Sequence, residues 1–210
     1  WESNVIWNQW RLVNGTELYD FRANVAEARH LAAANPGVVS RMRAHYESWW
    51  ASVEPGLKEP EPVAIIGSPE ESPTLLCSAD WWEIYADNPG HVSTAVGGAT
   101  GAPWYIGVAE TGEYRIELSR WPFNLMLPLT AGREPQKMHM GSLPPGKAMP
   151  IAGAKLRVGS GRELQAKAAP GARSISFRAR IEKATRIPLH AWFTGAKSED
   201  VCGAFYARIE

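Results

Sequence analysis

The sequence lacks the features of a membrane protein or a nucleic-acid-binding protein. No apolar run approaches the length of a membrane-spanning helix, and no charged-then-apolar secretory signal is present. The 22 basic and 22 acidic side chains cancel, so the chain has no net charge to attract nucleic acid or an anionic membrane. We therefore expect neither of these as a partner.

Reactive side chains are also scarce. The two cysteines cannot build a thiolate metal site alone, and the five histidines lack the paired spacing of a zinc-binding helix. The glycine run at residues 97–101 lacks the Lys-Ser/Thr of a phosphate-binding loop and does not open a helix. We expect no metal, no cofactor and no nucleotide in this chain.

Tryptophan and other hydrophobic residues, by contrast, are plentiful. The 210 residues include ten tryptophans and are 45% hydrophobic, which indicates a globular protein of one or two domains. Three prolines and alternating charge between residues 54 and 62 favour an extended spacer. We place a first segment at residues 1–54, a linker at 55–62 and a second domain at 63–210.

The first segment contains a predicted hairpin. Two short apolar-rich runs, residues 11–13 and 17–19, flank Asn14 and Gly15, the pair that best tolerates a type I′ turn. Residues 14–16 also match a glycosylation sequon, although the turn explains the same residues.

An amphipathic helix is predicted next. Asn35 offers a capping oxygen, Pro36 suits the first helical position, and Pro55-Gly56 ends the helix. The apolar positions recur at helical spacing: Val39, Met42, Tyr46, Trp49, Trp50 and Val53. This stripe is richer in aromatic residues than one hairpin can cover, so we expect it to pack on something larger as well.

Beyond the linker the apolar residues alternate with period two. Residues 104–108 and 114–118 flank a turn at 111–112, which predicts a half-buried antiparallel hairpin. Similar runs occur at residues 154–158, 175–181, 189–193 and 204–209. With no second convincing helix, the fold class is mainly β: a short α+β segment, hairpin plus helix, followed by an antiparallel β-sandwich that can be jelly-roll-like.

Two long segments, residues 87–103 and 120–150, interrupt the strand rhythm. Loops of this length are usually functional, packed against a neighbouring domain, or mobile. The uncharged, glycine-rich residues 96–101 favour the packing interpretation, because glycine permits close approach to another backbone.

A sugar-binding surface is a second interpretation of the tryptophans. Sugar sites combine flat aromatic faces with planar hydrogen-bonding groups, and carbohydrate-binding modules are frequently jelly-roll sandwiches. The alternative is ordinary core packing, which the in-phase Trp104 already indicates for itself. The candidate glycan-binding residues are Trp81, Trp82, Trp121, Arg120, Arg133, Asp87 and Asn88.

The first quarter of the chain resembles the C-terminal segment of type I sulfatases of the arylsulfatase class. In that family a W-(K/R)-L-V and E-L-Y-D strand pair precedes a P-x-V…L…Y…W helix. The matching positions here are Trp10-Arg11-Leu12-Val13, Glu17-Leu18-Tyr19-Asp20 and Pro36-Gly37-Val38 through Tyr46 to Trp49-Trp50. The resemblance implies a small C-terminal sheet beside a catalytic α/β domain that is absent here, and a chain opening on Trp1 is interpreted as a fragment.

The resemblance implies formylglycine and calcium in the parent enzyme, but this chain has no formylglycine motif. That motif needs Cys or Ser, then Pro or Ala two residues later and Arg four later. Cys77 and Cys202 have Ala at the second place, but Trp81 and Tyr206 stand where Arg is required. We expect no catalytic residue in this chain. The resemblance further implies a periplasmic or secreted protein.

The two cysteines leave two alternatives open. Cys77 lies near the first strand of the sandwich and Cys202 near the last, and such strands often pair, so a disulfide can form. Otherwise both are buried small hydrophobes. A bridge would imply an oxidising compartment, which fits an exported sulfatase.

Two functional hypotheses follow. The first is the non-catalytic C-terminal portion of an arylsulfatase-like sulfuric ester hydrolase, which packs against its catalytic domain and shapes the substrate rim. The second is an autonomous carbohydrate-binding β-sandwich whose ligand is a sulfated glycan. A contiguous apolar patch around Trp49 and Trp50 favours the first, and a shallow groove lined by exposed Trp81, Trp82 or Trp121 favours the second.

Overall fold

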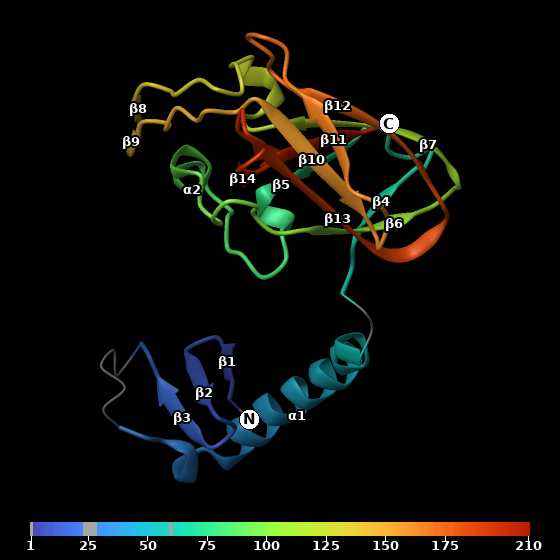
Figure 1. Ribbon diagram of the computed structural model, residues 1–210. Coiled ribbons are helices and arrows are strands. Elements are labelled where there is room, and N and C mark those ends of the chain that lie inside the picture. Colours follow the sequence, from blue (N-terminus) through green and yellow to red (C-terminus); the bar gives the residue numbers. More distant parts are fainter. Residues whose placement is uncertain (1, 23–28, 59–60) are drawn as a thin grey trace. The chain divides into compact units, whose positions relative to one another are not determined.

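The computed structural model describes residues 2–22, 29–58 and 61–210. The chain divides into two compact units, Trp1–Glu61 and Pro62–Glu210 (Figure 1). Of the expected extended linker, residues 59–60 lie outside the described residues, and Glu54–Lys58 form a 3₁₀ helix, η2, that continues directly from the preceding helix. An extended spacer over residues 55–58 was therefore a wrong prediction, because proline is tolerated in the first turn of a helix.

Unit 1 is a three-stranded antiparallel sheet with one long helix. The strands β1 (Asn4–Trp7), β2 (Trp10–Val13) and β3 (Glu17–Asp20) pair in that order. The predicted β2–β3 hairpin is confirmed: Asn14 and Gly15 have φ values of 50° and 71°, and the Thr16 amide donates to the Val13 carbonyl at 3.1 Å. Strand β1 was missed, because Val5 is its single buried residue and no alternation is visible.

The helix α1 (Pro36–Val53) begins at the predicted proline, after a short 3₁₀ turn, η1 (Ala32–Ala34). The predicted side-chain cap is wrong: among the described contacts Asn35 makes no capping bond, and its Nδ2 donates backwards to the Leu31 carbonyl at 3.1 Å. Met42 packs with Val5, Leu12 and Leu18 in a small core.

Unit 2 contains two sheets. The first has the order β11 (Leu164–Lys167), β10 (Gly153–Val158), β13 (Ala184–Thr194), β6 (Trp104–Val108), β4 (Ala64–Ile66), and β14 (Asp200–Gly203) also pairs with β13. The second has the order β12 (Ile175–Ile181), β7 (Gly112–Ser119), β15 (Tyr206–Ile209), β5 (Thr74–Cys77). Among the described strands, every pairing is antiparallel except that of β4 with β6.

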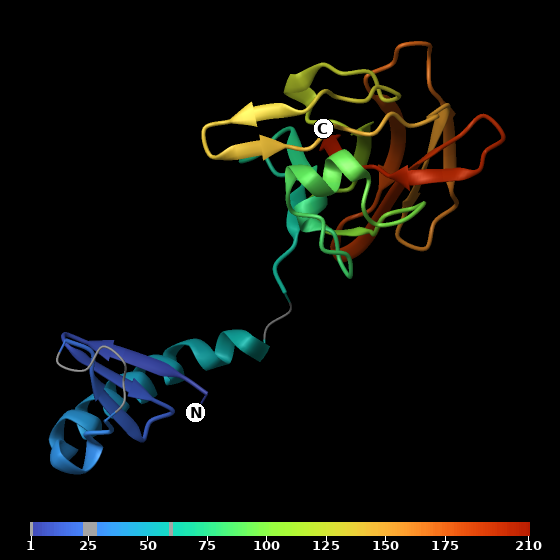
Figure 2. The same cartoon turned by 90° about the vertical axis from the view of Figure 1, so that its left-hand side faces the viewer.

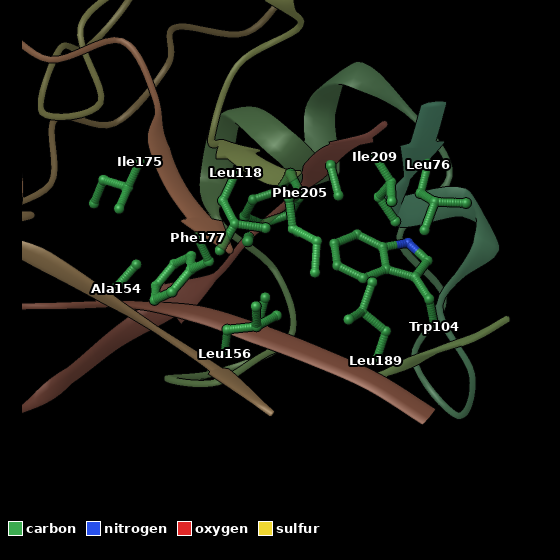
Figure 3. Close-up of a cluster of buried hydrophobic side chains, with 14 of the residues drawn as sticks. Leu76, Trp104, Leu118, Ala154, Leu156, Ile175, Phe177, Leu189, Phe205 and Ile209 are labelled. Atoms are coloured by element: carbon green, nitrogen blue, oxygen red, sulfur yellow. The ribbon is translucent and has the colours of Figure 1, made fainter. Parts of the chain in front are cut away.

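The core of unit 2 lies between these sheets (Figure 3). Leu156 and Leu189 come from the first sheet, Leu118 and Phe177 from the second, and all four are buried. Their side chains gather in one cluster, which removes the apolar face of each sheet from water. The predicted β-sandwich is confirmed.

The predicted hairpin of residues 104–118 is wrong in its pairing. Both strands exist, but in the described structure β6 pairs with β13 and β4, whereas β7 pairs with β12 and β15. The short turn between them therefore crosses from one sheet to the other. Alternation with period two identifies a half-buried strand but does not identify its partner.

The two long segments carry short elements. The first contains α2 (Pro89–Thr94), a six-residue helix that the sequence reading missed because it is too short to show a helical period. It follows another 3₁₀ turn, η3 (Ser78–Asp80). The second segment contains η4 (Phe123–Leu125) and a two-stranded hairpin of β8 (Gln136–Met138) and β9 (Gly141–Leu143), which extends away from the sandwich (Figure 2).

Candidate functional site

The predicted glycan-binding tryptophans differ in exposure. Trp81 is 6% exposed and Trp121 is 2% exposed, so both belong to the core. The ring of Trp81 lies 4.9 Å from that of Phe205 and 6.2 Å from that of Trp104. A platform of exposed Trp81 and Trp121 is therefore excluded, and of the three only Trp82, which is partly exposed, presents ring surface to a ligand.

Trp82 forms an aromatic group with Tyr105 and Arg186. The two rings meet edge to face at 5.5 Å, and the guanidinium of Arg186 lies 4.6 Å from the Trp82 ring and 4.4 Å from the Tyr105 ring. Beside this group runs a groove of about 300 Å³ whose lining includes Asp80, Trp82 and Tyr105. Sequence reasoning missed Arg186, because the residue meets this group only after β13 has paired with β6, the strand that carries Tyr105.

Asp87 and Asn88 lie at the start of α2 and have local roles. The side chain of Asn88 caps the helix by accepting from the His91 amide at 3.1 Å, and the Asp87 carboxylate lies 3.6 Å from His91 Nδ1. A hydrogen bond to Asp87 raises the pKa of the exposed Tyr85. Neither residue lines the Trp82 groove in the described structure, so the fold does not bring these two candidate residues together with Trp82 there.

Arg120 is fully buried. Its guanidinium stacks on Trp121 at 4.3 Å from the ring centroid, and its Nη1 donates to the Ala131 carbonyl at 3.0 Å. Within the described chain, its Nε and Nη2 have no hydrogen-bond partner. Burial lowers the pKa of Arg120, because the charged form loses its hydration.

Arg133 lies close to the same tryptophan. Its backbone pairs with Gly146 through two hydrogen bonds of 2.9 and 2.7 Å, and Gly146 in turn lies against the Trp121 ring. Arg133, Trp121 and Ser93 line one small pocket of about 120 Å³. The structure thus brings Arg120, Trp121 and Arg133 together, as grouped from sequence, and adds Ser93 from α2, for which the sequence held no signal.

The cysteines carry free thiols throughout the part of the chain that is described, so the disulfide alternative is overturned. The terminal strands do pair, but the partner of Cys77 on β5 is Tyr206 of β15, whereas Cys202 on β14 pairs with Phe193 in the other sheet. Burial raises the pKa of the Cys202 thiol to about 11. The partly buried Cys77 instead donates to Asp80 Oδ2 at 3.4 Å.

The described residues include no group of three or more His, Cys, Asp or Glu side chains that could hold a metal ion. Among the described helices, none combines the length and the apolar character that a membrane crossing needs. Comparisons with protein-family models, with curated proteins and with solved structures each give no match.

Proposed function

We propose that this chain is the non-catalytic C-terminal portion of an arylsulfatase-like sulfuric ester hydrolase, and that unit 1 packs against and supports the catalytic domain. The residues that carry the resemblance fold as the strand pair β2–β3 followed by α1, the order of elements that the resemblance implies. Unit 2 is then an accessory sandwich that shapes the substrate rim.

The observation that carries this proposal is an aromatic surface on the second half of α1. Tyr46 and Trp50 stack at 6.2 Å with an interplanar angle of 8°, and Trp49 lies 5.7 Å from Tyr46. Trp49 is 50% exposed and Trp50 is 37% exposed, whereas the core of unit 1 reaches only as far along the helix as Tyr46. Clustered exposed aromatic rings of this kind are typical of protein interfaces.

The occupant that we propose for this surface is the catalytic domain of the parent enzyme. Its face would be apolar where it meets Trp49 and Trp50, and polar at the edge, where Arg43 and Glu47 form an exposed ion pair of 3.7 Å. A periplasmic or secreted location forms part of the same proposal and rests on the resemblance, since the free thiols of Cys77 and Cys202 supply no argument for it.

Calcium and formylglycine belong to the parent in this proposal. The described residues offer no group of three or more potential metal ligands, and Trp81 occupies the place where the formylglycine motif requires Arg. The described residues therefore do not fit either group. The isolated chain should leave aryl sulfates unhydrolysed.

The test uses the full chain and a type I arylsulfatase catalytic domain truncated before its own Trp-(Lys/Arg)-Leu-Val strand pair. We expect the chain to bind this domain and to lengthen the half-life of its aryl sulfate hydrolysis at raised temperature. Trp49→Ala and Trp50→Ala should each weaken binding, whereas Leu75→Ala, at an exposed apolar position in unit 2, should not. Absence of a complex, or equal effects of all three substitutions, would refute the proposal.

A second candidate function is carbohydrate binding, which the Trp82 groove favours. It joins two aromatic rings, a guanidinium and the carboxylate of Asp80, a combination that suits a sugar ring with polar substituents. Titration of the chain with sulfated and unsulfated oligosaccharides decides it. Micromolar binding would place this function above the first if Trp82→Ala removes it and Tyr85→Ala leaves it intact. Tyr85 is an exposed aromatic residue outside the groove.

A further inference from the structure

The small pocket beside Trp121 has apolar walls and one cation. The cation is Arg133, and Ser93 of α2 supplies a hydroxyl. The apolar walls of the pocket include Trp121, Leu125 and Leu143. Its volume is about 120 Å³, close to the roughly 150 Å³ of an engineered apolar cavity that holds benzene. A ligand body the size of one aromatic ring therefore fits.

Three polar atoms of the residues that line this pocket lack hydrogen-bond partners. Nε and Nη2 of Arg133 and the Oγ of Ser93 are all buried, and within the described chain none of the three makes a hydrogen bond. Ser93 itself is only 1% exposed. Buried donors are nearly always paired in folded proteins, because an unpaired donor loses its hydration without compensation.

The positive charge at the pocket also lacks a counter-charge. None of its described lining residues is acidic, and the ion pairs of the described chain do not involve Arg133 or Arg120. Arg120 adds a second guanidinium, stacked on the Trp121 ring that forms part of the wall, with two further unpaired nitrogens. Arg120 is buried and Arg133 is half-buried, and a guanidinium removed from water without an anion is costly, so an anion that enters here gains binding free energy from them.

We propose that this pocket binds a small organic oxyanion. The apolar body lies against Trp121, Leu125 and Leu143, and the oxyanion accepts hydrogen bonds from the guanidinium of Arg133 and the hydroxyl of Ser93. The shared chemistry is a sulfate ester, phosphate ester or carboxylate on one ring-sized apolar group. This site is separate from the aromatic surface on α1, and its existence does not depend on the proposed sulfatase parentage.

The experiment measures binding to the full chain by calorimetry and by NMR of the Trp121 indole N–H, which donates to the Ala131 carbonyl at 3.2 Å. The probes are phenyl sulfate, phenyl phosphate and benzoate, with neutral benzyl alcohol and inorganic sulfate as comparators. We expect one or more of the organic oxyanions to bind and to shift the Trp121 signal, and both comparators to bind at least about tenfold more weakly. The rank order among the three names the anion class.

Variants then separate binding from folding. Arg133→Gln should weaken binding of the best probe about tenfold or more, Arg133→Lys should retain part of it, and Arg180→Gln, at an exposed ion pair with Glu182, should retain all of it. Ser93→Ala should have two measurable effects, because the hydroxyl that it removes is both buried without a partner and the proposed donor to the anion. It should raise the melting temperature of the free chain and weaken the probe.

Several outcomes would overturn the proposal. The first is that no organic oxyanion binds at concentrations up to about 10 mM. The second is that benzyl alcohol binds as tightly as the best oxyanion probe, and the third is that a folded Arg133→Gln variant binds that probe with unchanged affinity. If Arg133→Gln fails to fold, the Ser93→Ala measurement and the comparison of charged with neutral probes on the unmodified chain still decide the question.

Discussion

Gly101 and Gly203 meet face to face beside the indole of Trp81. A Cβ atom built on Gly203 would lie 2.8 Å from the Gly101 Cα and 2.6 Å from Trp81 Cη2. One built on Gly101 would lie 2.9 Å from the Gly203 Cα and 2.7 Å from Trp81 Cη2. Gly101, at the end of the glycine-rich residues 96–101, therefore approaches another backbone closely, as the composition predicted. That backbone is β14 of the same unit and not, as the packing interpretation expected, a neighbouring domain.

This contact predicts that Gly203→Ala is destabilising. The added methyl group meets backbone on one side and a packed indole on the other, so we expect the free energy of unfolding to fall by about 1–3 kcal/mol. Gly112→Ala on β7 is the control, since its Cβ would meet Tyr114 at an ordinary 3.7 Å. Urea unfolding measures both variants, and equal losses would contradict the steric explanation.

The two ends of α1 should respond differently to truncation. Met42 is 2% exposed, so Met42→Ala should cost about 2–5 kcal/mol in the stability of unit 1. Trp49→Ala should cost less than about 1 kcal/mol, because half of that side chain is exposed. Thermal unfolding followed at the unit 1 transition tests this difference, and a large loss for Trp49→Ala would mean that the helix end is covered within the chain.

The thiols should react at very different rates. Cys202 is fully buried and its pKa is raised to about 11, so little thiolate forms near neutral pH and the reagent cannot reach it. Burial also raises the pKa of Cys77, but part of that side chain is open to solvent. Under native conditions a thiol reagent should label Cys77 first, and denaturation without reductant should release a second reactive thiol. Recovery of no free thiol after denaturation would show a disulfide instead.

We expect His190 to make the folded chain less stable at acid pH. Burial lowers its pKa below the ordinary value, and its Nε2 lies 3.1 Å from the Thr100 carbonyl. The unfolded chain therefore takes up a proton at a higher pH than the folded chain. The stabilising contribution is present above about pH 6.5 and is lost as the pH falls through the folded pKa. We expect the difference between the unfolding free energies at about pH 7.5 and 5.5 to be smaller for His190→Gln than for the unmodified chain. An equal difference in both chains would exclude His190 as the cause.

The strands of unit 2 were largely predictable, but their pairing was not. Apolar residues at every second position predicted β7 and β12. The alternation arises because each of these strands has one face in the core and one in water. The same alternation holds whether a neighbouring strand lies in the same sheet or the opposite one, so β6 and β7 were wrongly paired. Helix α2 has six residues, too few for a period to appear.

The candidate site was predictable only in part. Arg120 and Trp121 are neighbours in sequence, and they stack where the backbone bends. Arg133 and Ser93 join them through the packing of two long segments, which no periodic pattern describes. Trp81, Trp121 and Arg120 were expected at the surface, but the structure places them in the core. Composition shows which side chains a chain contains but not which way they point.

Strand β13 pairs with strands of unit 2 that are far apart in sequence. Over its eleven residues it pairs with β10 along one edge and with β6 and then β14 along the other. The backbone amides of β13 that are bonded to these neighbours can exchange hydrogen with water only if the strands separate, so they report the opening of this sheet as one cooperative block. The β8–β9 hairpin, whose residues are almost all exposed, can open without disturbing that block.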